Sequence, residues 1–193
     1  MLTHHRDFLY EISPADRLIF ERVLPQKSRL LLHCSVFASE ATNDKILVVI
    51  QLDGGNDGIN TLVPYNDEGY AKHRTALRIP TDKLIKINDR VGFHPALRPV
   101  ANLLEDSRLA IVQGVGYPNP NHGTSGPVFL AGSSVQHGLI GEPRSLTDLE
   151  DGDLKVQFDF RRIYATLLKK WLNIAPEKSQ DGEFERMPLI AQS

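Results

Sequence analysis

A largely apolar run at residues 45–52 (KILVVIQL) constrains the fold of this 193-residue chain more than any other feature. The run is rich in β-branched residues and does not alternate with polar ones, which is typical of a strand buried on both faces, as in a parallel sheet. It leads directly into the glycine-rich turn DGGNDG at residues 53–58. Ligand sites of open α/β sheets gather where such strands end, so this turn is the first candidate for a functional site.

Later segments extend this pattern into a fold class. Residues 94–105 (HPALRPVANLLE) have helical apolar spacing and carry Pro95, which suits a first turn. Residues 109–115 (LAIVQGV) form a second apolar run, which completes the order strand, helix, strand of a βαβ unit. A short strand is expected at residues 128–131 and an amphipathic helix at residues 159–172. The sequence therefore predicts an α/β fold with a mostly parallel sheet flanked by helices.

Charge and composition exclude several classes of protein. Lys and Arg total 22 against 24 Asp and Glu, a net charge of -2, so no basic field would attract a nucleic-acid backbone. No stretch approaches the roughly 18 consecutive apolar residues of a membrane-spanning helix. The single cysteine, Cys34, excludes an intramolecular disulfide framework and a cysteine-based zinc cluster. We therefore expect no nucleic-acid partner and no transmembrane segment.

The start of the chain carries a degenerate export motif. Residues 5–9 (HRDFL) are similar to the twin-arginine motif R-R-x-F-L with histidine in place of the first arginine. The apolar core of a signal does not follow directly, because residues 13–25 have the cap, the proline and the spacing of a short amphipathic helix. The apolar run at residues 30–37 is equally compatible with a displaced signal core and with a buried strand. The expected location is periplasmic or exported if the signal works, and cytoplasmic otherwise.

Two side chains with metal-ligand chemistry follow the predicted buried strands. Asp53 comes directly after the first strand, and His122 lies in the loop after the second. A carboxylate and an imidazole on adjacent strand ends could share a divalent metal such as Zn, which would polarise an oxyanion ester or activate a bound water. Alternatively, Asp53 accepts backbone hydrogen bonds in a tight turn and His122 is a solvated loop residue. The GTSGP stretch at residues 123–127 misses the G-x-S-x-G motif by one residue, so no serine triad is predicted.

Longer motifs carry a resemblance to a known family. The segments LVVIQLDGGNDGINTLVP (47–64), GFHPALRPVANLLEDSRLAIVQGVGYPNPNH (92–122), and HGTSGP with DLEDGDLKVQFDFRRIYATLLKKWL (148–172) resemble a domain-of-unknown-function family of uncharacterised bacterial proteins. Proteins of that family are commonly exported through a twin-arginine signal and are related in fold to alkaline phosphatases and sulfatases. The GGNDGIN turn at residues 54–60 is the most specific part of the resemblance.

The resemblance implies that this chain is an internally shortened member of the family. Family members carry a long central region between the PNPNH and HGT segments, which here meet at His122. By the resemblance, Asp53 takes the place of a metal-binding aspartate and His122 that of the histidine in an Asp-His-Gly motif. Asn121 stands where the aspartate of that motif is expected. An amide oxygen is a weaker metal ligand than a carboxylate, so the implied metal site is compromised.

On this interpretation, residues 45–175 form an incomplete alkaline-phosphatase-like α/β domain. Residues 1–44 form a poorly defined N-terminal segment, either a degenerate export signal or a helix, and residues 176–193 form a polar tail. Sheet edges left unpaired by the missing region would favour self-association. Three functional hypotheses remain: a non-catalytic or degenerate family member, a metal-dependent hydrolase of phosphate or sulfate esters, and an inactive truncated gene product. The first is the leading hypothesis.

Overall fold

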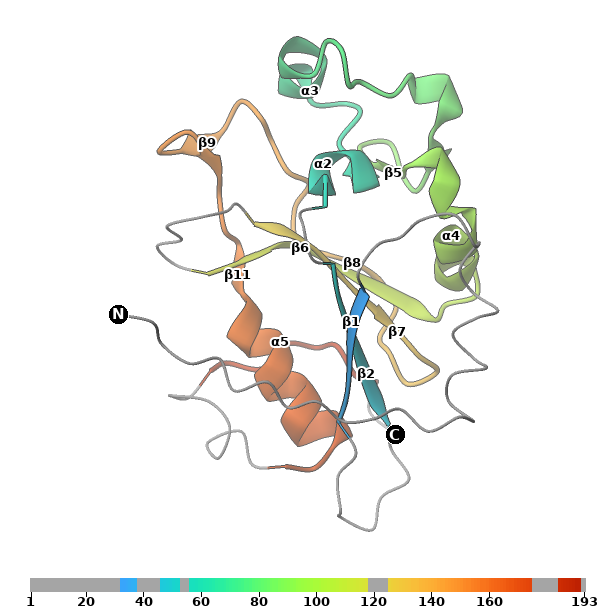
Figure 1. The fold of residues 1–193 in the computed structure, drawn as a ribbon, viewed down its shortest axis with the longest axis vertical. Helices are drawn as coiled ribbons and strands as arrows, with labels where there is room; N and C mark the ends of the chain where they lie inside the picture. Colours follow the sequence, from blue (N-terminus) through green and yellow to red (C-terminus); the bar gives the residue numbers. More distant parts are fainter. Residues whose placement is uncertain (1–31, 38–45, 53–55, 118–124, 175–183, 192–193) are drawn as a thin grey trace. The chain divides into compact units, whose positions relative to one another are not determined.

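The chain forms two compact units, residues 1–56 and residues 57–193, which are described here one at a time. The structure is a computed structural model that describes residues 32–37, 46–52, 56–117, 125–174 and 184–191. Figure 1 shows both units as ribbons, with most helices and strands labelled.

The first unit contains a two-stranded antiparallel sheet. β1 (Leu32–Phe37) pairs with β2 (Leu47–Leu52) in a continuous register (Figure 1). The apolar run of the sequence is therefore a strand, as predicted, but its partner strand runs antiparallel to it. The side chains of Ile46, Val48 and Ile50 are 63%, 42% and 49% exposed. One face of this stretch is thus exposed, which contradicts the prediction of a strand buried on both faces.

The second unit is organised around β6 (Leu109–Gly116), the central strand of a four-stranded sheet. β7 (Gly126–Ala131) pairs antiparallel with one edge of β6. β8 (Gly138–Ile140) pairs in parallel with the first half of β6, and β11 (Phe158–Asp159) pairs in parallel with its last residues. The sheet is therefore mixed, and β6 has hydrogen-bonded neighbours on both of its edges (Figure 1).

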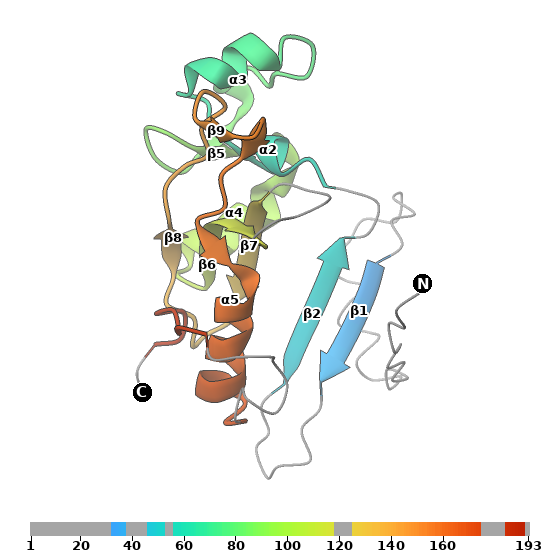
Figure 2. The same cartoon turned by 90° about the vertical axis from the view of Figure 1, so that its left-hand side faces the viewer.

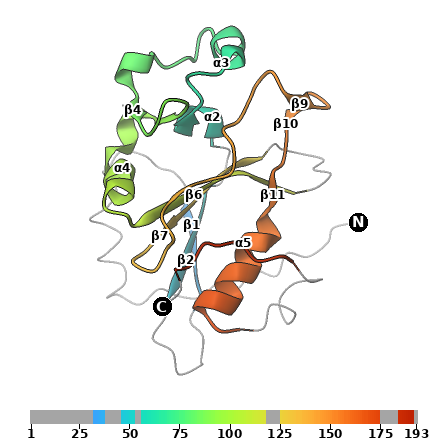
Figure 3. The same ribbon diagram turned by 180° about the vertical axis from the view of Figure 1, so that it is seen from behind.

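Two smaller sheets of the second unit are antiparallel. β5 (Gly92–Phe93) lies between β3 (Leu62–Val63) and β4 (Ile85–Lys86) in one of them. β9 (Leu149–Glu150) and β10 (Asp153–Leu154) form the other, a hairpin that Figure 3 shows from behind. Each of these strands is only two residues long, but β3 and β5 are buried and contribute Leu62 and Phe93 to the hydrophobic core.

The helices of the second unit are short. In chain order they are α2 (Gly58–Thr61), α3 (Glu68–His73), η1 (Thr81–Lys83), η2 (Pro95–Leu97), α4 (Arg98–Glu105), α5 (Phe160–Thr166) and η3 (Leu167–Trp171). Within this unit α3 and α5 lie at opposite ends, with the mixed sheet between them (Figures 1 and 2). In the described part of the chain, no helix has the length and apolar character needed to cross a bilayer.

The predicted fold class is wrong in its sheet. We expected a mostly parallel sheet flanked by helices, whereas the structure has mixed and antiparallel sheets with few helices. The βαβ unit expected from residues 45–52, 94–105 and 109–115 is not formed among the described strands, because β2 pairs with β1 while β6 pairs with β7, β8 and β11. The antiparallel β6–β7 pair has a physical reason in its connection. A parallel crossover needs a dozen or more residues, usually with a helix, and residues 117–125 are too short a connection for one. The chain therefore returns antiparallel along the edge of β6.

The predicted local elements agree better with the structure. The helix expected at residues 94–105 is confirmed as η2 followed by α4, and the strands expected at residues 109–115 and 128–131 are confirmed as β6 and β7. The helix expected at residues 159–172 is confirmed as α5, which continues into η3 with a wider turn. In that wider turn Leu172 donates its backbone N–H to the carbonyl of Leu167, the spacing of a π-helix.

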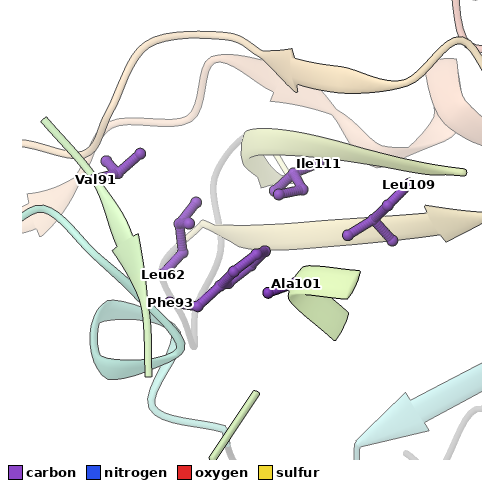
Figure 4. Close-up of a cluster of buried hydrophobic side chains, with 6 residues drawn as sticks. All are labelled: Leu62, Val91, Phe93, Ala101, Leu109 and Ile111. Atoms are coloured by element: carbon purple, nitrogen blue, oxygen red, sulfur yellow. The ribbon is translucent and has the colours of Figure 1, made fainter. Parts of the chain in front are cut away.

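The core of the second unit joins α4 and the β3–β5–β4 sheet to β6. Its buried side chains, shown in Figure 4, are Leu62, Val91, Phe93, Ala101, Leu109 and Ile111. The ring of Phe93 lies 6.3 Å from that of Phe129 on β7 in a tilted arrangement. The apolar face of α4 packs against this cluster as its sequence spacing predicts, with Ala101 buried and Val100, Leu103 and Leu104 partly buried.

The described part of the C-terminal region, residues 184–191, packs against the rest of the second unit. Leu189 is 0% exposed and Met187 is 5% exposed. The backbone N–H of Met187 donates to Oγ1 of Thr166, 2.8 Å away, and the carbonyl of Leu189 accepts from the N–H of Gln136 at 2.9 Å. This strap, residues 184–191, therefore joins α5 to the turn that follows β7.

Removal of the Leu189 side chain should destabilise the protein because it leaves a cavity in a fully buried site. We expect Leu189→Ala to lower the free energy of unfolding by about 2–5 kcal/mol. The matched control is Leu77→Ala, since Leu77 is 63% exposed. Chemical denaturation followed by circular dichroism measures both variants, and equal midpoints for the two would show that the strap does not contribute to the fold.

Candidate functional site

The two predicted metal ligands, Asp53 and His122, lie outside the described residues, as does Asn121. The structure therefore does not test whether Asp53 and His122 come together, and both remain predictions. In the ranges that the structure does describe, His, Cys, Asp and Glu side chains form no group of three or more that could hold a metal ion.

The most completely built polar centre of the second unit pairs Ser125 with Arg144. Ser125 immediately precedes β7, Arg144 follows β8, and the two side chains are 5% and 9% exposed. Both terminal guanidinium nitrogens of Arg144 donate to Oγ of Ser125, and one of them also donates to the Ser125 carbonyl. The third acceptor is the carbonyl of Lys155, 2.9 Å from Nη1 of Arg144. The Ser125 hydroxyl in turn donates to that same carbonyl at 2.8 Å.

Two glutamines hold the loop that carries Arg144. Nε2 of Gln113, a buried residue of β6, donates to the carbonyl of Gly141 at 2.8 Å. The side chain of Gln157 pairs with the backbone of Glu142 in both directions, accepting its N–H at 2.8 Å and donating to its carbonyl at 2.9 Å. These contacts fix the backbone just before Arg144, so the position of its guanidinium is set by β6 and by the segment before β11.

A bulge in β6 makes this arrangement possible. The ladder between β6 and β7 shifts register between Val112 and Val115, and Gly114 has a φ of 72°. A Cβ built on Gly114 would lie 2.8 Å from the side chain of Gln157, and the carbonyl of Gly114 accepts the N–H of Gln157 at 2.8 Å. Glycine is therefore required for two reasons, the left-handed backbone and the close approach of Gln157.

Burial of Arg144 affects its electrostatics. Loss of solvent around the guanidinium lowers the pKa of Arg144 to about 10. The side chain still carries its proton at neutral pH, so a positive charge is buried at this centre. No carboxylate among the described residues pairs with it, since the ion pairs found there join other partners. Nε of Arg144 is also buried, and no described acceptor contacts it.

The loop around Arg144 borders two cavities. Both are lined by Glu142, Pro143, Arg144 and Ser145. The smaller, of about 180 Å³, is completed by Pro64, Asn66, Asp67 and Arg90. The larger, of about 350 Å³, is completed by Asp148, Leu154, Lys155 and Gln157. The larger volume is in the range of small-molecule sites.

Carboxylates elsewhere in this unit serve as helix caps. Asp57, Asp67 and Asp159 each accept a backbone N–H at the start of α2, α3 and α5 respectively. Asp57 also pairs with Arg74 at 2.5 Å, and Asp159 pairs with Arg161. The hydrogen bond from the Arg161 side chain is the main cause that lowers the pKa of Asp159. These acids are thus engaged in local structure, as their positions before helices favour.

Sequence reasoning did not identify Arg144. The surrounding EPRS stretch matches no catalytic or binding motif, and a lone arginine between turn residues is typical of an exposed loop. The signals that exist are indirect, namely Gly114 within a strand pattern and Gly141 in the turn before Arg144. Glycines at such positions mark close backbone approaches, but their partners are decided by the fold.

Substitution of Gly114 should disturb the loop that carries Arg144. We expect Gly114→Ala to destabilise the protein by about 1–2 kcal/mol from the left-handed backbone alone, with the contact to Gln157 adding to this. Gly126→Ala is the matched control on the neighbouring strand, because a Cβ there would meet nothing within 4 Å. Denaturation midpoints measure the change in stability. If Gly126→Ala destabilised the protein as much as Gly114→Ala, the requirement for glycine at position 114 would be contradicted.

The capping role of Asp159 predicts a pH dependence. Because the folded pKa of Asp159 is lowered, its charge contributes stability that is present above the unfolded pKa, about 4, and is lost as the pH falls through the folded value. We expect Asp159→Asn, which keeps a capping oxygen, to lose up to about 1 kcal/mol at pH 7. The difference from the wild type should shrink below pH 4 in melts recorded at several pH values. Asp82→Asn, at an exposed position, is the control, and a pH-independent difference for Asp159→Asn would refute the role of the charge.

Comparisons of this chain with models of protein families, with curated proteins and with solved structures found no match.

Proposed function

We propose that this chain is a non-catalytic protein, a degenerate member of the alkaline-phosphatase-like and sulfatase-like family that its motifs resemble. The observation that carries the proposal is the environment of Ser125. Its hydroxyl accepts hydrogen bonds from the Arg144 guanidinium and donates to the carbonyl of Lys155. A serine nucleophile needs a neighbouring base that takes its proton. Arg144 remains protonated at neutral pH and is a donor, so this contact supports a structural role for the hydroxyl.

The histidine and the acids near the described core support the same proposal. Nδ1 of His94 accepts the backbone N–H of Ala96 at 3.1 Å, which caps η2. Asp57 and Asp67 cap α2 and α3. Each of these groups has the chemistry of a general base or metal ligand, but here each stabilises the start of a helix.

The sequence adds an independent argument at the metal site that the resemblance implies. Asn121 stands beside His122 where the family is expected to have an aspartate. Replacement of a carboxylate by an amide removes a negative charge that would balance a bound cation, so affinity for Zn or another divalent metal falls. A metal-dependent phosphate or sulfate ester hydrolase is therefore the less favoured function, and it requires both Asp53 and His122.

The test uses the purified full-length chain with an aryl phosphate and an aryl sulfate as substrates. We expect the wild-type protein to hydrolyse both substrates no faster than the Asp53→Ala/His122→Ala double variant. After exposure to Zn it should hold less than one metal ion per chain. Its melting temperature should not change when a chelator is added. The double variant, purified in parallel, accounts for contaminating phosphatase. Turnover that requires Asp53 and His122 and is lost with the chelator would overturn the proposal and establish the hydrolase.

A further inference from the structure

The buried charge of Arg144 has no counter-charge in the described structure. Its guanidinium contacts neutral acceptors, namely Oγ and the carbonyl of Ser125 and the carbonyl of Lys155. Its Nε is buried, and no described atom accepts from it. Buried charges in proteins are usually paired or bound to a ligand, because burial without compensation costs several kcal/mol. An unpaired buried guanidinium therefore points to something that binds beside it.

The larger cavity lies next to this charge, and its other charges are already paired. Lys155 forms an ion pair with Asp148, and Glu142 forms one with Arg90 at 2.8 Å. Arg90 lines only the smaller cavity, so Glu142 is balanced from outside the larger one, and Arg144 is the charged residue of the larger lining that forms no ion pair with a described residue. The smaller cavity differs, because it also contains the carboxylate of Asp67, which within the described ranges accepts from the backbone N–H groups of Tyr70 and Leu146 and forms no ion pair. An anion is therefore favoured in the larger cavity over the smaller one.

We propose that the larger cavity, lined by Arg144, Ser145, Lys155 and Gln157 among others, binds a small oxyanion. The anionic group would be a phosphate, a sulfate or a carboxylate, either free or at the end of a small molecule. The volume of about 350 Å³ accommodates such a group. This site is independent of Asp53 and His122, so the proposal does not rest on the presence or absence of catalysis.

The residues of the cavity supply suitable donors. Both terminal nitrogens of Arg144 donate to the same Ser125 hydroxyl oxygen, so one of these bonds can turn to an anion while the other continues to hold Ser125. The ammonium of Lys155 and the hydroxyl of Ser145 belong to the same lining. Charge-assisted hydrogen bonds from Arg and Lys to oxyanions are among the strongest in proteins. Arginine also presents the planar fork that such groups favour.

The test is titration of the full-length chain with inorganic phosphate, sulfate and acetate, measured by calorimetry at constant ionic strength maintained with chloride. We expect saturable binding of at least one of these anions with a Kd on the order of 1 mM, equivalent to about 4 kcal/mol. Lys155→Gln should weaken that binding by about tenfold or more, because it removes a donor and leaves Asp148 unpaired near the anion. Lys169→Gln, which makes the same charge change on η3, should leave the affinity unchanged.

Amide chemical shifts measured by NMR locate the bound anion without any substitution of the buried Arg144. We expect the same titration to shift the signals of Ser145, Lys155 and Gln157, with the affinity found by calorimetry. Absence of saturable binding by all three anions overturns the proposal, as does an equal loss of affinity in Lys155→Gln and Lys169→Gln. Shifts confined to residues outside the lining of the cavity overturn it as well. The titration measures anion binding and not hydrolysis. Failure of the anion-binding proposal can therefore be distinguished from failure of the proposed non-catalytic function, which the turnover assay tests.

Discussion

The structure of the second unit depends on one constraint: every backbone N–H and C=O group of the buried strand β6 must find a hydrogen-bonding partner. β6 is buried from Leu109 to Val115, so water cannot provide partners for its N–H and C=O groups. β7 supplies them along one edge, while β8 and β11 share the other. The strands around β6 are short, but each is held by this central ladder, and the loops between them are placed as a consequence.

The bulge at Gly114 connects this ladder to the polar centre. Because the strand bends there, Gln157 can approach the backbone of β6 and hold Glu142 through its side chain. Gln113, the residue before the bulge, binds the carbonyl of Gly141 from inside the strand. A local irregularity of the sheet thereby determines where Arg144 lies. The loop that carries Arg144 is therefore held in part through this backbone feature, while Ser125 and Lys155 hold the guanidinium itself.

Sequence reasoning predicted the elements whose signals are local. The helices at residues 94–105 and 159–172 follow from apolar spacing over successive turns, and the strand at residues 109–115 follows from a continuous apolar run. The direction of strand pairing was predicted wrongly, because an apolar run on both faces suits a parallel sheet but does not require one. Residues 117–125 are too short for a parallel crossover, so β7 returns antiparallel to β6, whereas β8 and β11 come later in the chain and pair with β6 in parallel. Asp53 and His122 stay predictions of the sequence, since they lie outside the described residues.

The amino-acid sequence by itself determined the positions of the helices at residues 94–105 and 159–172 and of the strands β2 and β6. These properties depend on neighbours within a turn or two of the chain. Only the tertiary structure decided that Arg144 is buried against Ser125 and that Leu189 is covered. The contact of Arg144 with Ser125 and the burial of Leu189 both involve residues far apart in the sequence. Composition and spacing carry no signal for such contacts. Their energies come from burial and from hydrogen bonds that exist only when the strands of the second unit are assembled.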